Sequence, residues 1–196
     1  MNAAPNPRVN GNHKNTLQER LNALEISYRR LLDSMDIVAN FDDYQYRGQG
    51  APDIQKILST THHRLEQLTP MESYGFFMAD EQELDFPLCY YAPESCANPL
   101  QESINRYTDD GTFAWALNQN RAIVVQESTL GRSTILHAIA TRDSVLGMFM
   151  GTINAEQDEI DKVSLMLLSV ILLNTAYVIE SSRLNYRIAQ HNALLE

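Results

Sequence analysis

Residues 134–153 read TILHAIATRDSVLGMFMGTI, and this stretch decides the fold. Two apolar runs, 134–141 and 145–153, flank a short polar turn at 142–144, which is the pattern of a β-hairpin. Both runs are apolar at consecutive positions instead of alternate ones, so both faces of the sheet that they form must be covered. The sequence therefore predicts a sheet with helices on both sides.

Further strand-like runs precede this hairpin. The segments SYGFFMA (73–79) and LDFPLCYYA (84–92) are rich in aromatic residues, and the acidic turn between them indicates a second hairpin. Pro87 lies inside the second run and favours an edge strand or a bulge, because proline cannot donate to a strand ladder. The short apolar segment AIVVQ (122–126) predicts one more strand, which we expect to be buried.

Helical segments are expected before and between these strands. A helix is predicted from about residue 53 to residue 68, and two shorter ones at 100–107 and 112–119. In the first helix we expect His62 and His63 to be surface or rim residues. Adjacent helical residues point about 100° apart, so these two histidines cannot bind one metal ion as a pair spaced by four residues would.

The last forty residues predict one long helix. Residues 158–196 contain neither glycine nor proline and include the apolar block LMLLSVILL (165–173). Such a helix would be roughly 58 Å long, which is more than the diameter of a domain of this size. Residues 163–179 carry no charge and reach the lower limit for a membrane span. Polar residues interrupt them, and we expect no membrane span here, because the sheet needs this helix as cover.

The amino-terminal region has two parts. Residues 1–16 are polar and predict a disordered leader. Residues 17–40 carry apolar residues at heptad spacing and predict a coiled-coil-like helix. This helix either lies on its own domain or pairs with another helix, such as its copy in a second subunit. The apolar seam consists of Leu17, Leu21, Leu24, Tyr28, Leu31, Met35 and Val38.

Composition and motifs exclude several classes of function. The formal net charge of −10, without any run of basic residues, argues against a nucleic-acid partner. Cys89 and Cys96 lack the spacing of a zinc site, and no secretory signal is seen, so we expect a cytoplasmic, reduced protein without a bound metal. We find no phosphate-binding loop, nucleophile elbow or HExxH motif, and therefore expect no enzymatic activity.

Three segments resemble the corresponding parts of GAF domains in bacterial signalling proteins. They are GTFAWALNQNRAIVV (111–125), LHAIATRDSVLGMFMGTI (136–153) and SLMLLSVILLNTAYVIESSRLN (164–185). The resemblance implies an α+β fold with an antiparallel sheet of five or six strands. It places the amino- and carboxy-terminal helices on one face and short helices over a pocket on the other. The GAF domain would cover 53–180, and 181–196 would extend the last helix as a signalling helix.

The resemblance also implies a small-molecule site, whose ligand the sequence does not identify. The NKFDE motif of cyclic-nucleotide GAF domains is absent, and neither cysteine is followed by the histidine of cyanobacterial bilin domains. A lone histidine, His137, could bind haem iron, but a hydrogen-bonded core histidine is favoured. Aromatic residues could line the pocket or be core, and polar residues, Arg132 among them, could hold an anionic ligand or be surface. The candidates are Phe77, Tyr90, Phe113, Trp115, Arg121, Ser133, His137 and Arg142.

Three functional hypotheses follow. The first is a dimeric sensory module that transmits a signal through its terminal helices to an output domain. The second is an adaptor that binds protein partners and no ligand, and the third is a small enzyme on the same fold. For the dimer we expect the amino-terminal seam, except Val38, to combine with the last helix, where Asn174 would fix the register. The expected contact residues of that helix are Leu167, Val170, Asn174, Tyr177, Leu184 and Ile188.

Overall fold

The computed structural model describes residues 53–80, 85–119, 121–127, 131–154 and 161–193. The leader predicted at 1–16 and the coiled-coil-like helix predicted at 17–40 lie outside the described residues. The chain divides by its internal contacts into two units, Met1–Asn40 and Phe41–Glu196, and every described residue belongs to the second unit.

Five strands in the described part of the chain form one antiparallel sheet. They are β1 (Ser73–Met78), β2 (Leu88–Ala92), β3 (Ile123–Glu127), β4 (Arg132–Ala140) and β5 (Val145–Asn154). Their order across the sheet is β2-β1-β5-β4-β3, which leaves β2 and β3 as the edges. The hairpin predicted at 134–153 is thus formed by β4 and β5, near the middle of the sheet. The predicted antiparallel sheet of five or six strands is confirmed.

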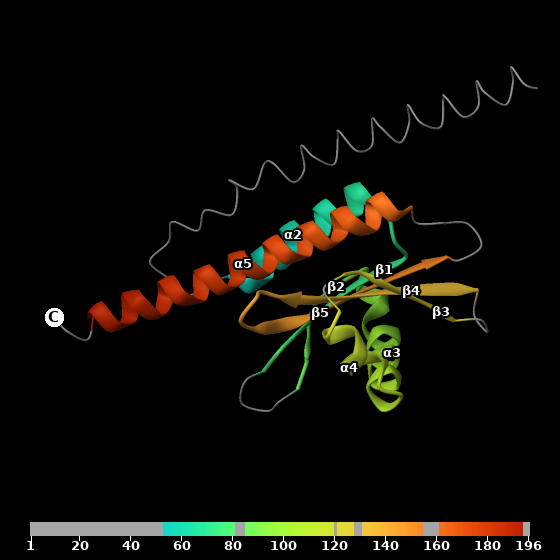
Figure 1. Ribbon diagram of the computed structural model, residues 1–196, viewed down its shortest axis with the longest axis horizontal. Helices are drawn as coiled ribbons and strands as arrows, with labels where there is room; N and C mark the ends of the chain where they lie inside the picture. The colour runs from blue at the N-terminus through green and yellow to red at the C-terminus, as the bar shows by residue number, and fades with distance from the viewer. Residues whose placement is uncertain (1–52, 81–84, 120, 128–130, 155–160, 194–196) are drawn as a thin grey trace, which may run out of the picture. The chain divides into compact units, whose positions relative to one another are not determined.

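Helices cover both faces of this sheet (Figure 1). They are α2 (Ile54–Leu68), the 3-10 helix η2 (Glu94–Cys96), α3 (Ala97–Asp109), α4 (Thr112–Leu117) and α5 (Lys162–Ala193). Helices α2 and α5 pack against each other on one face, and α3 and α4 lie on the other. This arrangement confirms the prediction that the first and last of these helices share a face.

The pleat of the central hairpin divides its side chains between the two helical layers. Leu136 and Met150 are partners across β4 and β5, and both are buried in the layer under α3 and α4. Phe149, the neighbour of Met150, points to the opposite face, where its ring lies 5.2 Å from that of Phe76. All four side chains are fully buried. Consecutive apolar residues in β4 and β5 therefore fill two separate layers of core.

Helix α5 begins with a capped turn and runs past the edge of the sheet (Figure 1). Asp161 Oδ1 accepts hydrogen bonds from the backbone N–H groups of Val163, at 2.8 Å, and Ser164, at 2.9 Å, which satisfies donors that the helix itself leaves unpaired. Seven buried positions, Leu168, Ile171, Leu172, Thr175, Ala176, Ile179 and Ser182, follow at helical spacing. Beyond Ser182 no described residue of α5 is buried, as expected for the projecting end of a long helix.

Some element boundaries differ from those predicted. Strand β2 begins at Leu88, directly after Pro87, because proline has no N–H to donate to the ladder. Helix α3 begins already at Ala97, and Pro99 is tolerated because it lies in the first turn, where N–H groups have no helical partner. The prediction of a buried strand at 122–126 is wrong, since β3 is an edge strand with an exposed Val124.

The prediction that both histidines of α2 are surface or rim residues is wrong for one of them. His63 is exposed, whereas His62 is only 8% exposed. The His62 Nδ1 atom lies 3.0 Å from the hydroxyl of Tyr90, and its ring packs against that of Tyr74 at 4.5 Å. Burial lowers the pKa of His62. Hydropathy alone did not indicate that tyrosines on the sheet would give this histidine a buried partner.

Glycine at position 147 is required by the close approach of β5 to β1. A Cβ atom built there would overlap the carbonyl oxygen of Phe77, which is backbone and cannot move aside. We predict that Gly147→Ala lowers the free energy of unfolding by about 1 to 3 kcal/mol, the usual cost of overpacking. Urea denaturation measures this change. The exposed Val145, on the same strand, provides the control, and a Gly147→Ala variant no less stable than Val145→Ala would contradict the prediction.

Candidate functional site

The layer between the sheet and helices α3 and α4 is filled with apolar side chains. Met148 from β5 and Phe77 from β1 are fully buried in it, and the Phe113 ring of α4 meets the Phe86 ring edge-on at 4.9 Å. The other buried members of this cluster are Cys96, Leu100, Ile104, Tyr107, Ala116, Ile123, Leu136 and Met150. Among the described residues, side chains of this cluster thus lie in the space in which the GAF resemblance implies a ligand pocket.

The four aromatic residues predicted to line a pocket do not meet. Phe77 and Phe113 belong to the hydrophobic cluster just described. Tyr90 lies on the other face of the sheet, where its ring contacts those of His62 and Phe76. Trp115 is 52% exposed on the outer side of α4. Three of these aromatic residues thus pack on the sheet, two on one face and one on the other, whereas the tryptophan lies on the surface.

The four polar candidates are also separated. Ser133 and His137 are buried on β4 and alternate onto the face covered by α5, whereas Arg121 and Arg142 are exposed. His137 and Arg142 line one hollow of about 420 Å³ beside α5, together with Ser169 of that helix. The structure therefore does not gather the eight predicted residues around one cavity, and ligand binding by them stays a prediction.

His137 has spare hydrogen-bonding capacity at this hollow. Its Nδ1 lies 2.7 Å from the backbone oxygen of Ala138, so Nδ1 carries the proton and donates it to the carbonyl. Its Nε2 is then an acceptor, and it is buried without a partner among the described residues. Burial lowers the pKa of His137. At neutral pH the imidazole is consequently uncharged and could accept one further hydrogen bond.

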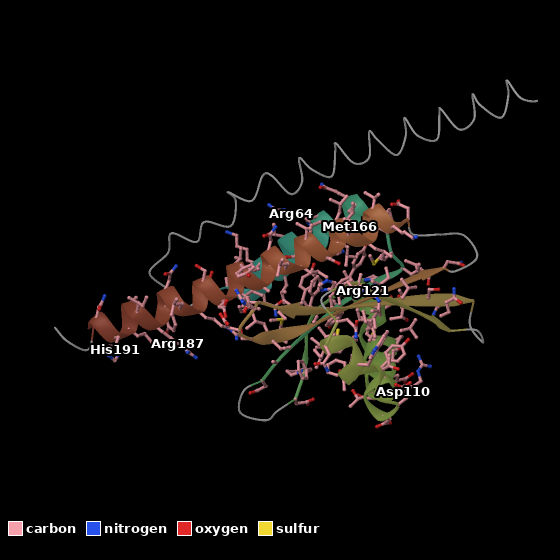
Figure 2. The ribbon with its side chains drawn as sticks, viewed as in Figure 1. Arg64, Asp110, Arg121, Met166, Arg187 and His191 are labelled. Atoms are coloured by element: carbon pink, nitrogen blue, oxygen red, sulfur yellow. The ribbon has the colours of Figure 1, made fainter. Side chains whose placement is uncertain are left out.

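An apolar stripe runs along the solvent side of α5. Its large hydrophobic side chains are exposed, although each would gain about 1.5 to 3 kcal/mol if fully buried. Met166 lies in the amino-terminal part of the helix, while Arg187 and His191 mark the end that projects past the sheet (Figure 2). The stripe consists of Val163, Met166, Val170, Leu173, Tyr177, Leu184 and Ile188. Spacings of three and four between most of these positions are typical of a helix that packs against another helix.

The stripe agrees only in part with the contact residues predicted for α5. Val170, Tyr177, Leu184 and Ile188 belong to it, and nothing tests their contact with a partner. Leu167 and Asn174 are instead half-buried beside the stripe. Met166 and Leu173 stand at the exposed seam positions, and the sequence analysis missed them. The block at 165–173 is apolar all round, so periodicity did not reveal which side faces the sheet.

Polar contacts fix α5 to the sheet at two points. The backbone N–H of Ala122, at the start of β3, donates to Ser169 Oγ at 3.1 Å. Two hydroxyls of the β4–β5 turn, Thr141 Oγ1 and Ser144 Oγ, both donate to Glu180 Oε1, at 3.1 and 2.8 Å. We call this second contact the Glu180 latch. It lies near the position where α5 leaves the sheet, and hydrogen bonds to a charged acceptor are stronger than neutral ones.

The remaining features of the described residues are their possible metal ligands, their two cysteines and the apolar character of α5. Among the described residues, no three His, Cys, Asp or Glu side chains group as a metal site would require. Cys89 and Cys96 are free thiols. Helix α5 is long and apolar enough to cross a membrane, with a mean hydropathy of 1.9 in its most apolar window. Core helices of soluble proteins pass the same test, and here the helix covers a sheet.

Several known structures with a similar fold are GAF domains. A GAF/HD domain protein from Geobacter sulfurreducens is 12% identical, with a TM-score of 0.51, and the match covers 67% of this chain and 95% of that one. The GAF3 domain of a Synechocystis sp. protein, in its photoproduct state, is 11% identical at a TM-score of 0.55, covering 69% and 99%. The GAF domain of an Acinetobacter phosphoenolpyruvate-protein phosphotransferase is 10% identical at 0.55, covering 81% and 95%.

These identities establish a shared fold alone. No protein-family model matches the sequence, and no curated protein matches it.

The Glu180 latch yields a prediction about stability. Glu180→Ala removes the acceptor of two hydroxyl hydrogen bonds and should lower the free energy of unfolding by about 2 kcal/mol. Asn185→Ala, at an exposed position on the same helix, should change it by less than about 0.5 kcal/mol. Chemical denaturation measures both. Equal effects of the two substitutions would show that the latch does not stabilise the protein.

His137 yields a prediction about pH. Because burial holds its folded pKa below the ordinary value of 6.5, the unfolded chain binds a proton first as the pH falls. Stability is therefore full above about pH 6.5 and decreases as the pH falls from there towards the folded pKa. We expect this decrease to be smaller in His137→Gln than in the unmodified protein, as measured by urea denaturation from pH 7.5 to 5. His63→Gln, on the surface of α2, is the control. An unchanged slope in His137→Gln would refute the assignment.

Proposed function

From the GAF fold of this chain, we propose that it is a non-catalytic regulatory module that forms a homodimer through α5. It transmits a signal along this helix to an output domain. The exposed apolar stripe of α5 is the observation that carries the proposal. The GAF neighbours support a sensory or regulatory role, because in two of them the GAF domain belongs to a larger protein, an HD domain protein and a phosphoenolpyruvate-protein phosphotransferase.

The stripe and the buried face of α5 are on opposite sides of the helix. At 3.6 residues per turn, Tyr177 and Leu184 lie roughly half a turn around the axis from Leu168 and Ile179. The sheet and α2 thus cover one side of α5, while the stripe on the other side is exposed and no described element packs over it. A second copy of the chain presents the same stripe, so two α5 helices can bury each other's apolar residues in a symmetric interface.

The amino-terminal seam supports the same arrangement. Residues 17–38 repeat apolar side chains at heptad spacing, as the stripe does between positions 163 and 177. The seam supplies a second apolar surface that a bundle of terminal helices can bury. The Glu180 latch then connects the sheet of each subunit to the helix that forms the interface. A change in the sheet would reach the interface through this contact.

A second candidate is a dimerisation or adaptor module that binds protein partners and no ligand. The filled layer under α3 and α4 favours it, because a pocket in that place would require the cluster around Phe77 and Met148 to move. Native mass spectrometry of freshly purified protein separates the two candidates. A small molecule that remains bound to the dimer supports sensing, whereas a dimer of bare chains supports the adaptor.

The dimer is tested by light scattering at micromolar concentration. We predict a mass of twice the 22.3 kDa of one chain. The double substitution Tyr177→Glu and Leu184→Glu places two charges in the stripe and should give a monomer, because buried unpaired charges are costly. Trp115→Glu replaces an equally exposed apolar residue on the other layer and should leave the dimer intact.

Circular dichroism shows whether the double variant remains folded. A monomeric unmodified chain, or a double variant that is still a dimer, would overturn dimerisation through the stripe.

A further inference from the structure

A second hollow lies on the face of the sheet away from α5, at the ends of three strands. It has a volume of about 360 Å³, and α3 and η2 form its outer wall. The sheet contributes Ser73 from the start of β1, Thr152 from the end of β5 and Arg132 from the start of β4. None of these residues belongs to the buried hydrophobic cluster, which fills the neighbouring space. The size lies within the range of small-molecule sites.

Each wall of this hollow carries one positive and one negative side chain. On the side of the sheet, Arg132 Nε lies 3.1 Å from Glu72 Oε2. On the side of α3, Arg106 and Glu102 are one helical turn apart. The four formal charges cancel, although the whole chain carries −10. A purely anionic ligand would meet two carboxylates here and a purely cationic one two guanidinium groups, whereas a molecule with both charges can be paired on each wall.

Hydroxyl groups form the floor between these walls. Ser73 and Thr152 are partners across β1 and β5, and their hydroxyls are hydrogen-bonded to each other. Thr134 is the partner of Thr152 on β4, so its side chain lies on the same face. It is only 1% exposed, and its Oγ1 makes no hydrogen bond among the described residues. This row of hydroxyls can therefore rearrange to donate to a ligand oxygen that enters from the hollow.

The remaining wall is apolar and closely packed. Leu100 of α3 and Cys96 line the hollow and are buried. A Cβ atom on Gly75 would lie only 2.9 Å from Leu100 Cδ1, so the Leu100 side chain of α3 packs directly against the backbone of β1. The hollow thus has a fixed wall suited to an aliphatic or aromatic group, beside a mixed-charge rim.

From this combination we propose that the hollow binds a small zwitterion, namely an amino acid whose ammonium and carboxylate groups pair with the rim and whose apolar side chain contacts Leu100. The inference rests on the proposed sensory role, for which it names the ligand class. It also differs from the pocket expected under α3 and α4, because the ligand would displace no member of the hydrophobic cluster. The carboxylate would bind an arginine, and the ammonium group Glu72 or Glu102.

Binding is tested on the full chain with each of the standard amino acids, first by thermal shift and then by calorimetry. We expect at least one apolar amino acid to bind. The two analogues of this amino acid that carry a single charge should not bind. For leucine these analogues are isocaproate, which lacks the ammonium group, and isopentylamine, which lacks the carboxylate. If no amino acid binds, or if an analogue binds as tightly as the amino acid, the proposal is overturned.

Variants locate the site. Arg132→Gln or Arg106→Gln should weaken binding of the best amino acid about tenfold or more, because each removes a charged hydrogen-bond partner. Arg121→Gln removes an exposed arginine that lies just before β3 (Figure 2) and does not line this hollow, so it should leave binding unchanged. Equal effects of all three substitutions would overturn the assignment. Light scattering on the same samples separates the proposals, because a dimer that binds no amino acid refutes only the ligand site.

Discussion

The central hairpin is buried on both faces, and this burial determines where the helices must lie. Strands β4 and β5 alternate bulky apolar side chains to either side, so each side requires its own cover. Helices α3 and α4 supply one cover and fill it with side chains. Helices α2 and α5 supply the other, and α5 carries an exposed apolar stripe on its side away from the sheet.

Strand pairing brings residues that are remote in the sequence together both at the hollow lined by Arg132 and at the Glu180 latch. Register places Ser73, Thr134 and Thr152 in one row, although they come from three different strands. The same register brings the turn between β4 and β5 to α5, where Glu180 accepts from both of its hydroxyls. The hollow lined by Arg132 and Thr152 and the Glu180 latch thus lie at opposite ends of one hairpin.

The sequence predicted the elements better than it predicted the site. Hydrophobic periodicity located the strands and long helices, because the pattern of apolar residues extends over many positions and a single polar residue does not hide it. The burial of His62 depends on Tyr74 and Tyr90 of the sheet, and no pattern in the helix itself encodes those partners. The exposure of Trp115 depends on which side of the short helix α4 faces the sheet, and six residues are too few to show this by periodicity. Arg132 was recognised as a polar candidate, but Glu72 and Thr152 were not, because their proximity arises only from strand pairing.

The β4–β5 hairpin also has a mechanical consequence. Its strands are paired from Arg132 and Asn154 to Ala140 and Val145, with one register shift just before that last pair, over a length of roughly 30 Å at about 3.3 Å per residue. The hydrogen bonds between the two strands resist shortening and sliding of one strand along the other, but the hairpin can tilt as one rigid unit. A small displacement at the open end would swing the turn by a comparable amount, and with it the part of α5 that projects beyond the sheet.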